Sequence, residues 1–210
     1  MLTACSSWLI STTTRLSGVV DPKYRDNFHA QKMVVIGFGM SIEEQKSLEN
    51  TFKESLAKYN VTMLSGLEMF PPTRHHSRKE IYEIAKKRGA DSFLMVMADN
   101  RDVSKTYVPP SYYPGRSKST VSGSGSFITI NTETEPGYTI DGYTVNKPGM
   151  NIRVLLQNPK NRDIIWTAEG SSSGNGYASF SDLIISIAEG TVKELSKEDL
   201  IALKPELQSE

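Results

Sequence analysis

The earliest regular pattern in the chain is a short, continuous apolar run that ends beside a glycine. Residues 32–38 read Lys-Met-Val-Val-Ile-Gly-Phe, and a β-branched run of this length is typical of a strand buried on both faces. Residues 1–30 carry only short apolar pairs and no sustained period. We therefore expect residues 1–30 to form a tether, residues 31–202 to form the folded domain, and residues 203–210 to form a polar tail.

A capped helix is predicted directly after this strand. Ser41 and Glu44 stand three positions apart, which is the spacing of a capping box, and apolar residues then recur four apart on one helical face. This pattern predicts a helix over residues 42–59. A short apolar run at 61–64 predicts the second strand.

The same order of signals then repeats. Ser77 and Glu80 again have capping-box spacing, and Gly89 closes the predicted helix after a basic last turn. Residues 90–98 are too apolar for a strand at the edge of a sheet, so we expect a third, buried strand there. Residues 32–98 therefore predict the order βαβαβ.

The composition changes at residues 99–150, where Tyr, Pro, Gly, Ser and Thr predominate. Such a segment predicts an insert or a long hairpin. Only residues 127–130 and 143–145 are recognisable as its strands. Because apolar residues are sparse in it, we expect its tip to contribute little to the core.

After the insert, the pattern returns to that of regular elements. Residues 151–157 and 164–169 predict an antiparallel pair around a polar turn, and alternation should place Ile164 and Trp166 on one face beneath a helix. An amphipathic helix over 183–195 closes the domain. The predicted fold is a single α/β (α+β) domain with a mixed sheet, in the order βαβαβ, long insert, antiparallel hairpin and closing helix.

Composition and charge narrow the classes of partner. The chain has 24 Lys and Arg residues against 24 Asp and Glu residues, and it lacks a basic stripe, so we expect no nucleic-acid partner. Its apolar runs are only as long as strands, so we expect no membrane-spanning helix. The single cysteine, Cys5, leaves no partner for an intramolecular disulfide and no thiolate cluster for a metal. We expect neither a cofactor nor a metal ion.

The position of Cys5 is informative. Residues 2–5 read Leu-Thr-Ala-Cys, which resembles the lipobox of bacterial lipoproteins, whose cysteine is diacylated and becomes the mature N-terminus. The apolar part of the signal should precede this motif, so either the start lies upstream of Met1 or the match arises by chance. Two acyl chains hold a protein firmly on a membrane. Ser6 resembles the pattern sorted to the outer membrane, so we expect the domain on its periplasmic face.

Three stretches of the domain carry a further resemblance. They are the strand ending at 36–38, the segment at 88–91 that reads Arg-Gly-Ala-Asp, and the hairpin at 151–166. Over residues 32–200 this succession resembles the envelope lipoproteins related to the curli-secretion lipoprotein. The resemblance implies a mixed α/β periplasmic domain on a lipid anchor, and it carries no catalytic motif.

One short segment has chemically active side chains. Arg74, His75 and His76 precede the second predicted helix, and histidine is a frequent acid or base. With carboxylates after the third strand, such as Asp99 and Asp102, these side chains would suit a hydrolase. Adjacent side chains do not converge on one metal ion, however, and a solvent-facing loop accounts for the same residues.

Tyrosines are concentrated in the insert. A tyrosine gives a large contact area with few torsions to freeze, which favours it at recognition surfaces. The alternative is that these rings pin the insert onto the domain. The candidate partner-binding residues are Tyr107, Tyr112, Tyr113, Tyr138 and Tyr143.

The sequence thus favours a non-catalytic, lipid-anchored envelope protein with a role in interaction or assembly. Its expected partners are the membrane, through lipid on Cys5, and another envelope protein, peptidoglycan or a second copy of the chain. The alternative function is a periplasmic hydrolase that uses the segment Arg74, His75 and His76 with nearby carboxylates.

Overall fold

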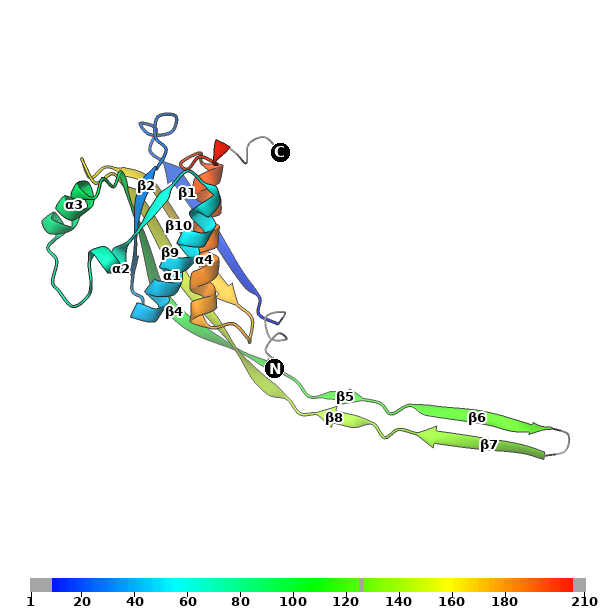
Figure 1. Cartoon of the computed structure of the whole chain (residues 1–210). Coiled ribbons are helices and arrows are strands. Elements are labelled where there is room, and N and C mark those ends of the chain that lie inside the picture. Colours follow the sequence, from blue (N-terminus) through cyan, green and yellow to red (C-terminus); the bar gives the residue numbers. More distant parts are fainter. Residues whose placement is uncertain (1–8, 125–126, 206–210) are drawn as a thin grey trace. The chain divides into compact units, whose positions relative to one another are not determined.

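A six-stranded mixed sheet is the framework of the fold in this computed structural model, which describes residues 9–124 and 127–205 (Figure 1). Its strands are β1 (Thr12–Val20), β2 (Lys32–Phe38), β3 (Thr62–Ser65), β4 (Ser92–Val108), β9 (Tyr143–Gln157) and β10 (Ile164–Gly174). The spatial order is β1-β10-β9-β4-β2-β3. β2 is parallel to β3 and β4, whereas β10 is antiparallel to β1 and β9. The predicted α/β (α+β) class with a mixed sheet is confirmed.

The chain divides into two compact units. Residues 105–146 form one unit, which we call the arm, and the residues on either side of that segment form the other, which we call the body. The boundaries fall inside β4 and β9, which are continuous strands. The sequence placed the start and end of the insert a few residues further out, at 99 and 150.

The predicted helices are confirmed, and their starts follow the capping signals. Ser41, Ser77 and Ser179 each accept a hydrogen bond from the backbone three positions on, and the acidic side chain there bonds back to the cap. Such reciprocal bonds satisfy donors that a helix start otherwise leaves unpaired. The helices are α1 (Ile42–Ser55), η1 (Leu56–Lys58), α2 (Gly66–Met69), α3 (Arg78–Lys87) and α4 (Phe180–Lys197).

The two faces of the sheet are covered unequally. α1 and α4 pack against one face, where the main core collects Leu94 and Val96 from β4 together with residues of β9 and β10. The alternate residue Phe93 points the other way, into a smaller cluster with Ala85 of α3. Successive side chains of a strand point to opposite faces, so the central strand β4 contributes to both clusters. The second face is covered by α3 and, through Met69, by the short helix α2.

Strand β1 corrects the prediction of a tether over residues 1–30. Residues 12–20 pair antiparallel with β10 along their whole length, and they alternate between less and more exposed positions. The period was hidden because Thr12, Thr14 and Gly18 interrupt the apolar residues of the inner face. Thr14 Oγ1, for example, lies 2.9 Å from Ser172 Oγ and 2.8 Å from Ser186 Oγ of α4, so hydroxyl pairs replace apolar contacts there.

The register of β10 corrects a second prediction. Ile164 and Trp166 do not share a face, because an irregularity between them shifts the pairing with β9. Trp166 and Ile165 are both fully buried, whereas Ile164 is 47 % exposed. A β-bulge of this kind breaks the two-residue alternation on which the sequence argument depended. The predicted burial of Trp166 itself is confirmed.

The arm is a long hairpin, as the composition predicted, but it holds more strand than expected. Its strands are β5 (Ser111–Tyr113), β6 (Ser117–Ser124), β7 (Phe127–Thr134) and β8 (Tyr138–Ile140). β5 pairs with β8 and β6 pairs with β7, both antiparallel. Because neither face of a two-stranded ribbon is buried in a core, its sequence lacks the apolar alternation by which strands are recognised.

Part of the predicted polar tail at 203–210 belongs to the body. Leu203 forms an isolated bridge with Tyr59, and the Lys204 N–H donates to the Lys58 carbonyl oxygen at 3.1 Å. Within the described chain no helix combines the length and the apolar character needed to cross a membrane.

Candidate functional site

The tyrosines of the arm are exposed, and two of them stack on each other. Each of the five candidate rings is between 47 % and 67 % exposed, so none is a core residue. Tyr113 and Tyr138 are direct register partners across β5 and β8, and their rings stack with centroids 5.1 Å apart. Stacked cross-strand pairs stabilise a hairpin by a fraction of a kcal/mol to about 1 kcal/mol. The remaining three rings are Tyr107, Tyr112 and Tyr143.

The distal strands β6 and β7 carry a second surface made by their register. Ser117 and Ser119 face Thr134 and Thr132, with hydroxyl oxygens 3.3 Å and 3.0 Å apart. The next pair on this face is Val121 and Ile130. Both are more than 60 % exposed. This face of the ribbon therefore changes from a ladder of hydroxyls to an apolar pair.

The hydrogen-bonding edges of the arm are open. Each of its two sheets contains only two strands among the described residues, so each strand pairs on one side and presents backbone groups on the other. An exposed edge of this kind is a template for pairing with a further strand. An isolated two-stranded hairpin is at best marginally stable in water. The arm thus combines exposed rings with unpaired backbone edges.

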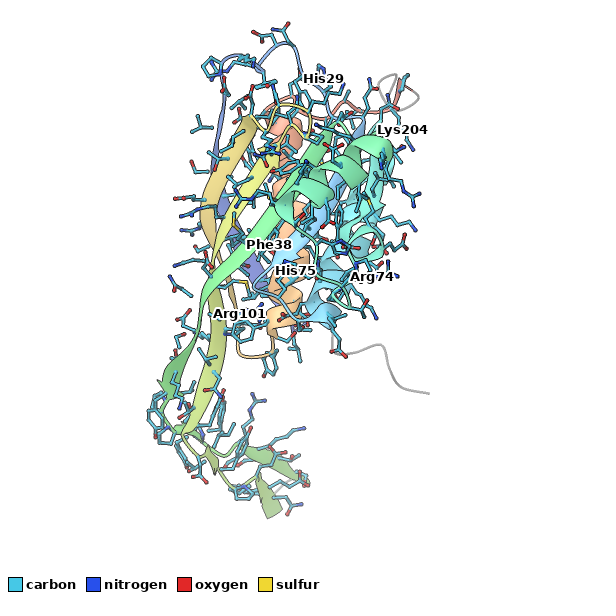
Figure 2. The ribbon with its side chains drawn as sticks, turned by 90° about the vertical axis from the view of Figure 1, so that its left-hand side faces the viewer. His29, Phe38, Arg74, His75, Arg101 and Lys204 are labelled. Carbon is cyan, nitrogen blue, oxygen red and sulfur yellow. The ribbon has the colours of Figure 1, made fainter. Side chains whose placement is uncertain are left out.

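The residues of the hydrolase alternative are not brought together in one site. Arg74 and His75 lie exposed on the loop before α3 (Figure 2). His76 lines a cavity next to α3 that contains no carboxylate among its described lining residues. Asp99 lines a different hollow, and Asp102 lines a third. A catalytic arrangement needs its groups within hydrogen-bond reach of a shared substrate position.

A mostly apolar cavity beside α3 was not foreseen from the sequence. Its volume is about 480 Å³. It lies against the sheet face that carries α3, and its walls come from β2, α3, β4 and β9, which are far apart in the sequence. The apolar lining residues are Ile36, Phe38, Ile81, Phe93, Met95 and Leu155, and the polar ones are His76, Arg78, Tyr82 and Gln157.

Two of the four polar lining groups of this cavity are already paired with each other. Tyr82 Oη donates to Gln157 Oε1, and Gln157 Nε2 donates to the Arg162 carbonyl oxygen at 2.7 Å. The Arg162 guanidinium also lies 4.9 Å from the centre of the Tyr82 ring. By contrast, Nε2 of His76 is shielded from solvent and has no hydrogen-bond partner in the described part of the chain.

The buried carboxylates of the body lie on α1 and have structural partners. Burial raises the pKa of Glu44, but hydrogen bonds from Arg101 and Ser41 outweigh it and hold the pKa below its ordinary value. Burial raises the pKa of Glu49 above its ordinary value, although Ser65 and the Leu67 N–H donate to it. Both carboxylates fix the ends of neighbouring elements, and neither lines the cavity beside α3.

Over residues 9–124 and 127–205, no group of three or more His, Cys, Asp or Glu residues is arranged to hold a metal ion. The candidate lipidation residue, Cys5, lies outside the described residues.

Comparisons with known proteins give similarity in structure alone. No protein-family model matches the chain, and no curated protein matches it significantly. Among solved structures it is similar to a point-substituted PelC dodecamer from Paraburkholderia phytofirmans, with 14 % identity and a TM-score of 0.45 over 88 % of this chain and 96 % of that one. A second PelC dodecamer from that organism gives 14 % identity and a TM-score of 0.43 over 90 % and 97 %. A PDZ domain protein from Parabacteroides distasonis gives 9 % identity and a TM-score of 0.30 over 89 % and 36 %.

Proposed function

We propose that this protein is a non-catalytic interaction component of the bacterial cell envelope, and that the arm is the element that binds another protein. The observation that carries the proposal is the arm itself, a two-stranded ribbon whose five tyrosines are all exposed. Monomeric proteins seldom expose contiguous aromatic and apolar surface without a partner for it.

The chemistry of the arm favours a protein partner that adds a strand or a flat surface. Open backbone edges supply main-chain hydrogen bonds to an extended segment, and alternate side chains then give specificity. The paired rings of Tyr113 and Tyr138 supply a rigid contact area at low entropic cost. A second copy of the chain meets these requirements as well as a different envelope protein does, because its own arm offers the same edges.

Replacing residues 111–140 with a short Gly/Ser linker should abolish partner binding and leave the body folded. The entropy of closing a loop changes slowly with its length, so the free energy of unfolding should change by about 1 kcal/mol or less. Thermal melts would report the fold, while sedimentation velocity and capture from crosslinked envelopes would report self-association and partner binding.

A matched pair of tyrosine variants separates the arm from tyrosines in general. Substituting Tyr112, Tyr113 and Tyr138 with Ser should reduce capture strongly, whereas Tyr177→Ser should not, although Tyr177 of the body is as exposed as Tyr112 at 67 %. A lost melting transition in the linker variant would make the arm part of the fold. An intact melt with undiminished capture would move the binding surface to the body.

We further propose that Cys5 carries the lipid anchor, on the strength of the lipobox resemblance at residues 2–5. Expressed with its upstream coding sequence, the protein should incorporate a labelled fatty acid and sediment with membranes. Cys5→Ala should release it into the soluble fraction, because the acyl chains supply the membrane affinity. A Cys5→Ala variant that stays membrane-bound, with no label on the parent, would contradict the proposal.

A further inference from the structure

The cavity beside α3 has the dimensions and lining of a small-molecule site. Its volume of about 480 Å³ falls within the range of roughly 300–1,000 Å³ that is usual for ligand pockets. Apolar side chains from three strands and from α3 make up most of its wall. Phe38 at its edge remains 46 % exposed, so apolar surface is left uncovered where the cavity meets solvent.

The polar groups with free bonding capacity lie together at the start of α3. His76 and Arg78 flank the cap residue Ser77, and both line the cavity. Nε2 of His76 has no hydrogen-bond partner within the described residues, and a buried polar nitrogen left unpaired costs free energy. Arg78 forms none of the ion pairs found between described residues.

The carboxylate nearest in sequence is already occupied. Glu80 Oε2 accepts hydrogen bonds from the Ser77 N–H at 2.8 Å and from Ser77 Oγ at 2.9 Å, so it serves the helix cap. Tyr82 and Gln157 are likewise bonded to each other. The hydrogen-bonding needs left in the cavity are therefore those of an imidazole nitrogen and a guanidinium. A carboxylate accepts hydrogen bonds from the guanidinium, and it accepts one from His76 in the tautomer that carries the proton on Nε2.

We propose that this cavity binds a small anionic amphiphile, a monocarboxylate with a short- to medium-length alkyl chain. The alkyl chain lies against the sheet between Ile36, Met95 and Leu155, and the carboxylate is held by Arg78 and His76 at the start of α3. The apolar floor gives affinity for the chain, and the cation gives selectivity for the charged head over a neutral one. This assignment does not rest on the arm or on the lipid anchor.

Titration calorimetry of the full chain with sodium octanoate and with 1-octanol tests the proposal. Octanoate should bind saturably at one site, and octanol, which has the same chain and no charge, should bind at least several-fold more weakly. Arg78→Gln and His76→Gln should each weaken octanoate binding, by about tenfold for the arginine, because a hydrogen bond to a charged group is lost.

Neighbouring residues of the same types provide matched controls. Arg74→Gln and His75→Gln change exposed side chains on the same loop that do not line the cavity, and they should leave octanoate binding unchanged. Thermal melts of all four variants would show that each is folded. The proposal is overturned by absent saturable binding in the millimolar range, by octanol binding as tightly as octanoate, or by equal losses in the loop controls and the cavity variants.

Discussion

Trp166→Ala should lower the free energy of unfolding by about 3–5 kcal/mol, the range for truncating a large core aromatic. Trp166 has no exposed surface and is among the largest fully buried side chains of the body. Its ring lies over Gly18 of β1, where an added Cβ would come within 2.4 Å of the indole nitrogen. Removing the ring would leave a cavity over Gly18 on the core face of the sheet, which the surrounding main chain cannot fill.

Urea melts of two companion variants make this expectation specific. Ile164→Ala, two residues away but 47 % exposed, should cost much less than Trp166→Ala. Trp166→Phe should recover part of the loss, because the indole N–H has no hydrogen-bond partner in the described chain and its removal relieves an unsatisfied donor. A loss below about 1 kcal/mol for Trp166→Ala would show that the ring does not fill the core.

Gly170→Ala should destabilise the body by at least about 1–3 kcal/mol, as overpacking does when backbone must move. A Cβ on Gly170 would lie 1.8 Å from the Arg15 carbonyl oxygen and 3.0 Å from Leu16 Cα. These atoms belong to β1, which pairs with Gly170 through Leu16. No side chain can rotate away to make room, so the two strands must separate at this point.

Hydrogen exchange localises the effect of Gly170→Ala. Amides of β1 should lose protection while amides of β2 and β4 keep theirs, because the clash lies at the edge of the sheet. Ser171→Ala, the next residue on β10 and an exposed one, should change neither the melt nor the exchange pattern. Unchanged protection of β1 in the Gly170→Ala variant would contradict the close strand approach.

The elements that could be predicted are those whose signals are local. The capping boxes at Ser41 and Ser77 and the apolar run of β2 depend on a few adjacent residues, and the structure has them where expected. β1 was missed because threonine and glycine interrupt the apolar residues of its inner face, where the Thr14 hydroxyl is bonded to β10 and α4. These hydrogen bonds form only in the folded state, and residues that make them do not appear as an apolar period in the sequence.

The candidate sites divide in the same way. The exposure of Tyr112 and its neighbours could be anticipated, because Pro, Gly and Ser around them cannot form a core. The cavity beside α3 could not, because Ile36, Ile81 and Leu155 meet only after β2, α3 and β9 have assembled. Arg78 carried no signal of its own, since a basic residue in the first turn of a capped helix is an ordinary surface residue.

The pairing of β1 with β10 shortens the free segment of chain between the proposed anchor and the body. If the free segment reached residue 31, the fully extended chain would place the start of the domain up to roughly 90 Å from Cys5. Because β1 begins at Thr12, the extended chain between Cys5 and the body spans at most about 25 Å. A lipid on Cys5, as proposed, would then confine the domain close to the bilayer. A force applied through such an anchor would reach β1 first, where the hydrogen bonds to β10 along the whole strand would resist it together.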